Sequence, residues 1–146
     1  MHIFENLVEQ FLTVDGRVFV SPQHDIAWDS DLNEGGSSPD FVALDFRPTP
    51  QEVVIVEVTT GAALEGIFKR IANRETRWYS PLKKKLVKDR VIDDSWAFRF
   101  LGFVRRPNIE EAQQKFAAHS DVRFYSLEDA AFSYAYWDSR KNGLPR

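Results

Sequence analysis

The sequence of 146 residues contains no cysteine. This absence excludes a disulfide framework, thiolate metal sites and a cysteine nucleophile, and it fits a reducing compartment. No apolar run reaches the roughly 18 residues that a membrane-spanning helix needs. The segment Met1 to Phe11 also lacks the basic start and long apolar stretch of a signal peptide. We therefore expect a soluble cytoplasmic protein with no membrane contact.

Other common signatures are missing as well. The three histidines, His2, His24 and His119, are scattered and do not have the spacing of metal ligands. The glycine-rich stretch at Gly35-Gly36 lacks the lysine of a phosphate-binding loop. No serine lies in a nucleophile-elbow pattern. These absences argue against histidine-based metal sites, nucleotide-binding loops and serine hydrolases.

The composition that remains is that of an ordinary globular protein, with 43% hydrophobic and 28% charged residues. A chain of this length is close to the commonest domain size, so we expect one domain over residues 1–146. Strand-like segments alternate with helical ones, which favours an α/β sandwich around one mixed sheet. The strands are expected at 17–20, 40–46, 53–59, 96–104 and 122–126, and the helices at 3–14, 61–78, 82–88 and 109–118.

Charge is distributed unevenly along the chain, although the net charge is only −3. Residues 1–40 contain eight acids and Arg17 as their one lysine or arginine. Residues 69–90 contain nine lysines and arginines against Glu75 and Asp89. An acidic region beside a basic one suits a metal site next to a phosphate-binding surface. The alternative is two unrelated solvated faces.

Two carboxylates stand where core residues are expected. Asp40 opens one predicted strand, and Glu57 lies within the β-branched run Val53 to Thr59. A hairpin turn around Pro48 and Pro50 would bring the two acids side by side. A buried carboxylate is costly unless it is paired, protonated or bound to metal. The spacing leaves two interpretations open: a site for a hard cation such as Mg²⁺, or an ion pair with an arginine from the basic segment.

These residues resemble a known family. Ser38-Pro39-Asp40-Phe41, followed by Ile55-Val56-Glu57-Val58-Thr59, is similar to the motif of the PD-(D/E)xK, or restriction-endonuclease-like, nuclease superfamily. Phe4-Glu5-Asn6-Leu7-Val8 resembles the first helix of that family, and the resemblance extends from about Phe4 to Val104. It implies a mixed central sheet flanked by helices, with an αβββαβ core.

The resemblance also implies roles for individual residues. Asp40 and Glu57 would be ligands of Mg²⁺ or Mn²⁺, and Glu5 would be a further ligand, direct or through water. The family has a lysine two residues after the second acid, whereas this chain has Thr59, which can hydrogen-bond water but supplies no charge. Lys69 is then the leading candidate for a displaced basic residue, with Arg70 and Arg74 as alternatives.

The basic segment is the expected contact for nucleic acid, because it follows the second acidic strand directly. Trp78 and Tyr79 within it could stack on bases, but a core position is the favoured interpretation for both. The residues expected to bind phosphate are Lys69, Arg70, Arg74, Arg77, Lys83 and Lys84.

The leading hypothesis is therefore a metal-dependent endonuclease that hydrolyses phosphodiester bonds, with DNA ahead of RNA as substrate. Many nucleases cut both strands as symmetric dimers, so a homodimer is compatible with this function. The first alternative is an inactive domain of the same fold that binds nucleic acid or a protein. The second is an interaction or immunity protein whose acidic amino-terminal region engages a basic partner.

Overall fold

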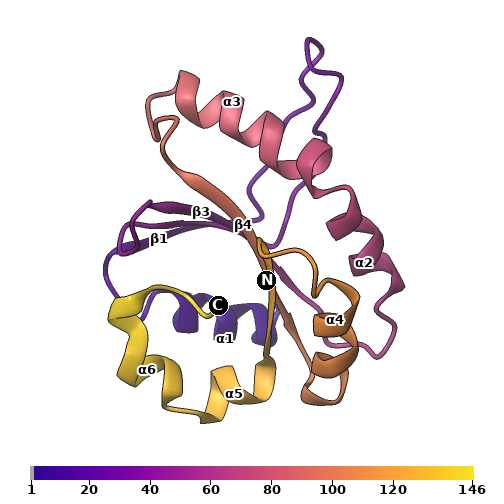
Figure 1. Cartoon of the computed structure of the whole chain (residues 1–146), viewed down its shortest axis with the longest axis vertical. Helices are drawn as coiled ribbons and strands as arrows, with labels where there is room; N and C mark the ends of the chain where they lie inside the picture. The colour runs from indigo at the N-terminus through magenta and orange to yellow at the C-terminus, as the bar shows by residue number, and fades with distance from the viewer. Residues whose placement is uncertain (1) are drawn as a thin grey trace.

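The computed structural model describes residues 2–146 and contains one five-stranded mixed sheet in the order β1-β2-β3-β4-β5 (Figure 1). The strands are β1 (Val18–Pro22), β2 (Phe41–Asp45), β3 (Glu52–Val58), β4 (Ala97–Val104) and β5 (Val122–Ser126). The α-helices are α1 (Ile3–Leu12), α2 (Glu65–Ala72), α3 (Ser80–Lys88), α4 (Ile109–Lys115), α5 (Leu127–Phe132) and α6 (Ala135–Ser139). No helix within residues 2–146 is long and apolar enough to cross a bilayer.

The sheet combines an antiparallel meander with two parallel crossovers. β1, β2 and β3 pair antiparallel, whereas β4 lies parallel to β3 and β5 parallel to β4. The chain passes through α2 and α3 between β3 and β4, and through α4 between β4 and β5. This arrangement confirms the prediction of an α/β protein with a mixed central sheet flanked by helices.

The central strand β3 is buried on both faces, as its β-branched sequence predicts. Val53, Val54, Ile55 and Val56 have no exposed surface. Val53 and Ile55 pack with residues of α2, α3 and α4, whereas Val54 and Val56 pack with residues of α1, α5 and α6. Figure 1 shows these two groups of helices on opposite faces of the sheet. Because side chains alternate along a strand, Glu57 points to the face that α2 covers.

The basic segment is built differently from the prediction. α2 begins at Glu65 and not at Gly61, and a π-helical turn, η1 (Glu75–Tyr79), joins it to α3. Pro81 does not stop the helix, because it lies in the first turn of α3, where its missing N–H is tolerated. Trp78 and Tyr79 are buried, which confirms their predicted core position.

Asn108 precedes the helix predicted at 109–118, and asparagine is a common N-cap residue. It occupies the N-cap position of α4 but forms no side-chain cap hydrogen bond. Its amide group donates instead to the carbonyl oxygen of Gly61 at 3.3 Å.

The carboxyl-terminal segment is packed, although its polar sequence after Asp138 predicts a frayed tail. Leu144 is buried, and its N–H donates to Asp45 Oδ2 at 3.1 Å. Arg99 donates to the carbonyl oxygens of Leu144 and Pro145 at 3.1 and 2.9 Å. A buried guanidinium thus satisfies the backbone of a segment that has no regular pairing of its own.

The same guanidinium balances a buried acid at the start of β3. Glu52 is 5% exposed, and its Oε1 accepts from Arg99 Nε at 3.2 Å and from Arg146 at 2.9 Å. Two cations therefore compensate one carboxylate, which is the arrangement expected of a structural acid in a core.

We expect Arg99→Ala to lower the free energy of unfolding by about 3 kcal/mol, because it leaves Glu52 underpaired and two carbonyls without a donor. The matched control is Arg105→Ala, which removes an exposed partner of Glu128 and should cost about 1 kcal/mol or less. Urea unfolding of both variants measures the difference. Equal losses would contradict the role given to Arg99.

Candidate functional site

The β2–β3 hairpin brings Asp40 and Glu57 together, as the sequence predicts. Phe41 pairs with Val56, so Asp40 and Glu57 are the next residues across the two strands. The N–H of Asp40 lies 3.4 Å from Glu57 Oε2, and the N–H of Val58 donates to Asp40 Oδ2 at 2.7 Å. Both carboxyl groups are thus fixed by backbone at the edge of the buried core.

Glu57 is held in an environment that disfavours its charge. The residue is 8% exposed. Its burial, together with the neighbouring Asp40 carboxyl group, raises the pKa of Glu57 to about 7. The guanidinium of Arg70 acts in the opposite direction but does not cancel these effects. A bound cation therefore stabilises the ionised form of Glu57 more than it would stabilise that of a fully solvated carboxyl group.

Arg70 is the basic residue that meets the pair. Its Nε lies 3.2 Å from Glu57 Oε1, and about a third of its side chain is exposed. The ion pair weighed from the sequence as an alternative to metal is therefore present in the structure. Lys69 is exposed, and no contact joins its ammonium to Asp40 or Glu57 within residues 2–146.

The two glutamates of β3 make an informative comparison. Glu52 at one end has two arginines and, among residues 2–146, no acid in hydrogen-bond contact. Glu57 at the other end has one partly exposed arginine and a second carboxyl group beside it. Two adjacent carboxylates that share a single cation destabilise the folded state relative to a fully paired acid. Glu57 is therefore less fully compensated than Glu52.

Glu5 and Thr59 do not add to this pair. Glu5 caps its own helix, accepting from the N–H of His2 at 3.1 Å, and α1 packs on the sheet face opposite to α2. Thr59 follows β3 and donates its N–H to Phe103 at 2.9 Å. Among residues 2–146, no group of three or more histidine or acidic side chains is arranged to hold a metal ion.

The chemistry of the donor set nevertheless fits a hard divalent cation. Mg²⁺ is commonly bound through one or two carboxylates, with water completing its coordination. Asp40 and Glu57 supply two adjacent carboxyl groups. Arg70 contacts Oε1 of Glu57, whereas Oε2 lies on the side of Asp40. Asp40 and Glu57 are therefore the residues that could hold Mg²⁺ or Mn²⁺.

Several of the basic residues expected to bind phosphate are engaged within the protein. Arg74 binds Asp121 with Nη2 at 3.0 Å from Oδ1, and Lys84 lies 2.7 Å from Asp29. Arg77 is half-buried beside the ring of Trp78, and Lys83 is half-buried. The contact of Lys84 with Asp29 joins the basic segment to the acidic amino-terminal region. Phosphate binding by this set remains a prediction.

The polar cluster of Arg74, Tyr79 and Asp121 was not predicted from the sequence. The hydroxyl of Tyr79 donates to Asp121 Oδ2 at 3.0 Å, and Arg74 binds the same carboxylate. Asp121 follows α4 and Tyr79 precedes α3, so no local pattern could have linked them.

The raised pKa of Glu57 predicts a specific pH dependence of stability. The folded state holds this proton more tightly than the unfolded chain, whose ordinary pKa is 4.5. The stabilisation is therefore fully present below pH 4.5 and is lost as pH rises through about 7. Glu57→Gln should gain stability relative to wild type between about pH 5 and about pH 8, by at most about 3 kcal/mol. Urea unfolding across this range is the measurement.

The matched control is Glu110→Gln, which removes an exposed carboxyl group elsewhere. A stability difference between wild type and Glu57→Gln that stays constant with pH would contradict the environment described for Glu57.

Comparisons of this chain with family models, with curated proteins and with solved structures gave no match. Asp40, Glu57 and Arg70 are therefore the residues whose geometry bears on function.

Proposed function

We propose that this protein is a divalent-metal-dependent nuclease with a restriction-endonuclease-like sandwich. The observation that carries the proposal is the meeting of Asp40 and Glu57 across the β2–β3 hairpin, where burial and mutual proximity disfavour two bare charges. Support comes from the order of elements, in which a helix and a three-stranded meander precede a helix and a parallel strand.

In this proposal Asp40 and Glu57 hold Mg²⁺ or Mn²⁺. The bound ion would polarise a phosphate oxygen and lower the pKa of a coordinated water. The chain itself orients both carboxyl groups, through the N–H of Val58 on Asp40 and through Arg70 on Glu57. Thr59 is a proposed hydrogen-bond partner of water, whereas Glu5 is left out of the proposed site because α1 packs on the opposite face of the sheet.

The positive charge that Thr59 cannot supply is assigned to α2. Arg70 is placed best, because its guanidinium already lies 3.2 Å from Glu57. It could neutralise charge on a phosphate next to the acids. Lys69 on the same helix stays the alternative, since its exposed ammonium is free to reach a bound backbone. DNA is the proposed substrate, and RNA is the alternative.

A second candidate function is an inactive domain of the same fold that binds nucleic acid or a protein. Two observations favour it: Thr59 replaces a charged residue, and Arg70 already forms an ion pair with Glu57. An arginine that only compensates Glu57 would leave Asp40 and Glu57 without a metal. The two functions differ in metal binding and in cleavage.

Calorimetric titration of Mn²⁺, with supercoiled-plasmid nicking on the same samples, tests the nuclease. We expect wild type to bind and nick, and Asp40→Asn and Glu57→Gln to lose both by about 100-fold or more. Asparagine and glutamine keep an acceptor oxygen, so the fold is preserved. Asp94→Asn is the control, because Asp94 is exposed and distant in sequence. A wild-type protein that binds no Mn²⁺ would exclude the metal site and favour the binding domain.

A second comparison assigns the basic residue. Arg70→Ala should lower the nicking rate by about 100-fold, because it removes the charge beside Glu57. Lys69→Ala should change it by about threefold or less, the size expected of one screened phosphate contact. Single-turnover cleavage rates at saturating Mn²⁺ provide the measurement. The reverse ranking would assign the role to Lys69.

A further inference from the structure

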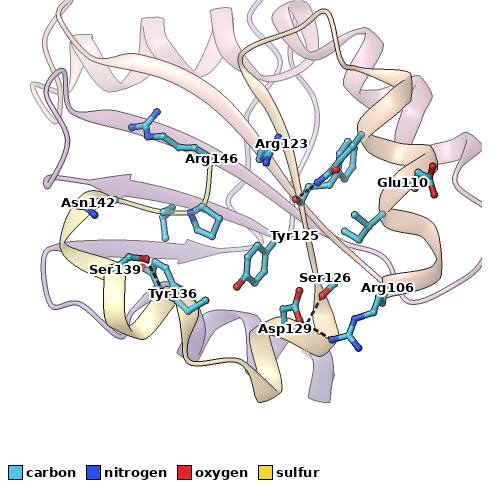
Figure 2. Close-up of a pocket in the computed structure, with 17 residues that line it drawn as sticks. Arg106, Glu110, Arg123, Tyr125, Ser126, Asp129, Tyr136, Ser139, Asn142 and Arg146 are labelled. Atoms are coloured by element: carbon cyan, nitrogen blue, oxygen red, sulfur yellow. Dashed lines mark hydrogen bonds and ion pairs between the residues drawn. The ribbon is translucent and has the colours of Figure 1, made fainter.

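A groove runs along the outer edge of the sheet, beside β5. A cavity of about 690 Å³ lies against Arg123, Phe124, Tyr125 and Ser126, with α4 on one side and α6 and the carboxyl-terminal segment on the other (Figure 2). A neighbouring cavity of about 270 Å³ extends it to Val122. The two share Arg123 and Phe124, and together they touch every residue of β5. This feature lies on the opposite side of β4 from β3 and its acids.

The floor of this groove, here called the β5 groove, is an open strand edge. The N–H of Phe100 in β4 donates to the carbonyl oxygen of Asp121 at 2.7 Å. Because backbone groups alternate along a parallel strand, residues 121, 123 and 125 bond to β4, whereas Val122, Phe124 and Ser126 point away from it. The N–H of Val122 donates to the carbonyl oxygen of His119 at 3.2 Å, so the open part of the edge is centred on Phe124. The carbonyl of Phe124 has only a distant contact, at 3.5 Å, with the Gln113 amide. Its N–H has no acceptor within residues 2–146.

Within residues 2–146, the rim of the β5 groove also offers one cation without an ion-pair partner. Arg106 binds Asp129 at 2.8 Å, and Arg146 binds Glu52 at 2.9 Å. Arg123 is exposed, and no carboxylate within residues 2–146 forms an ion pair with it. An unpaired guanidinium beside an unpaired strand edge suits an extended ligand that carries a carboxylate.

We propose that the β5 groove binds an extended peptide with an acidic side chain, which adds to β5 as a further strand. Main-chain hydrogen bonds to Phe124 would provide affinity, and Arg123 would select the acidic residue. The five residues of β5 span roughly 16 Å at about 3.3 Å per residue, so a segment of four or five residues fits. The proposal does not depend on the nuclease activity.

A peptide fits the β5 groove better than the other occupants do. A second copy of this chain would present an edge recessed between its own α4 and α6, so the walls would meet before the strands. Nucleic acid would place phosphates against carbonyl oxygens of β5 and near Asp129 and Glu110, while two of the three rim arginines are already paired. A single extended chain would satisfy both the N–H and the carbonyl group of Phe124.

The experiment uses the full chain and a phage-displayed library of random heptapeptides, followed by fluorescence anisotropy with a selected peptide. We expect enriched peptides to contain an acidic residue and to shift the backbone amide resonance of Phe124. Arg123→Glu should weaken binding by about tenfold or more, and replacing the acid of the peptide by lysine should restore binding to that variant. Lys88→Glu, an exposed control away from β5, should leave affinity unchanged within about twofold.

A second variant of the peptide tests the added strand directly. N-methylation of alternate peptide residues removes the donors of a ladder and should abolish binding in one register. Failure to enrich any peptide, equal binding to wild type and Arg123→Glu, or tolerance of N-methylation in both registers would overturn the proposal. Displacement of the peptide from Phe124 by a single-stranded oligothymidylate that binds more tightly would overturn it in favour of nucleic acid.

Discussion

The burial of β3 on both faces is the constraint on which the rest of the structure depends. A central strand without solvent on either side cannot carry a carboxylate unless something offsets the loss of water. Glu52 meets this requirement with Arg99 and Arg146. Arg99 also binds the backbone of the carboxyl-terminal segment. Glu57 meets it only in part, because its neighbours are a second carboxyl group and one partly exposed arginine. The first end of β3 is therefore fully compensated within the protein, and the second is compensated only in part.

The hairpin and its two acids could be predicted from the sequence because their determinants are local. The prolines between β2 and β3 mark the turn, the β-branched run marks a strand buried on both faces, and alternation fixes which face receives Glu57. The identity of the basic residue beside Glu57 could not be predicted in the same way. α2 begins four residues later than predicted, and the burial of Ile67 and Ile71 decides which side chain of the helix meets the sheet. Packing thus places Arg70 at Glu57, although Lys69 is its neighbour in sequence.

The parts that sequence patterns missed are those that depend on long-range contacts. The carboxyl-terminal segment has a polar sequence, yet Arg99 and Asp45 hold its backbone from positions far earlier in the chain. The residues of β5 were predicted correctly as a strand, but its place at the sheet edge follows from the strand order alone. The β5 groove then lies along that edge, lined by residues of α4 and α6. An unpaired strand edge of this kind can pair with another chain, and no local sequence pattern predicts where such an edge lies.

A crystal grown with Mn²⁺ would test the proposed divalent-metal site at Asp40 and Glu57 without relying on cleavage. Anomalous difference density at the manganese edge locates the ion independently of any activity. We expect a peak within coordination distance of one oxygen from each carboxyl group, with the guanidinium of Arg70 beside it. A crystal with Mn²⁺ elsewhere, no peak at this pair and Arg70 still bound to Glu57 would contradict a metal site at Asp40 and Glu57.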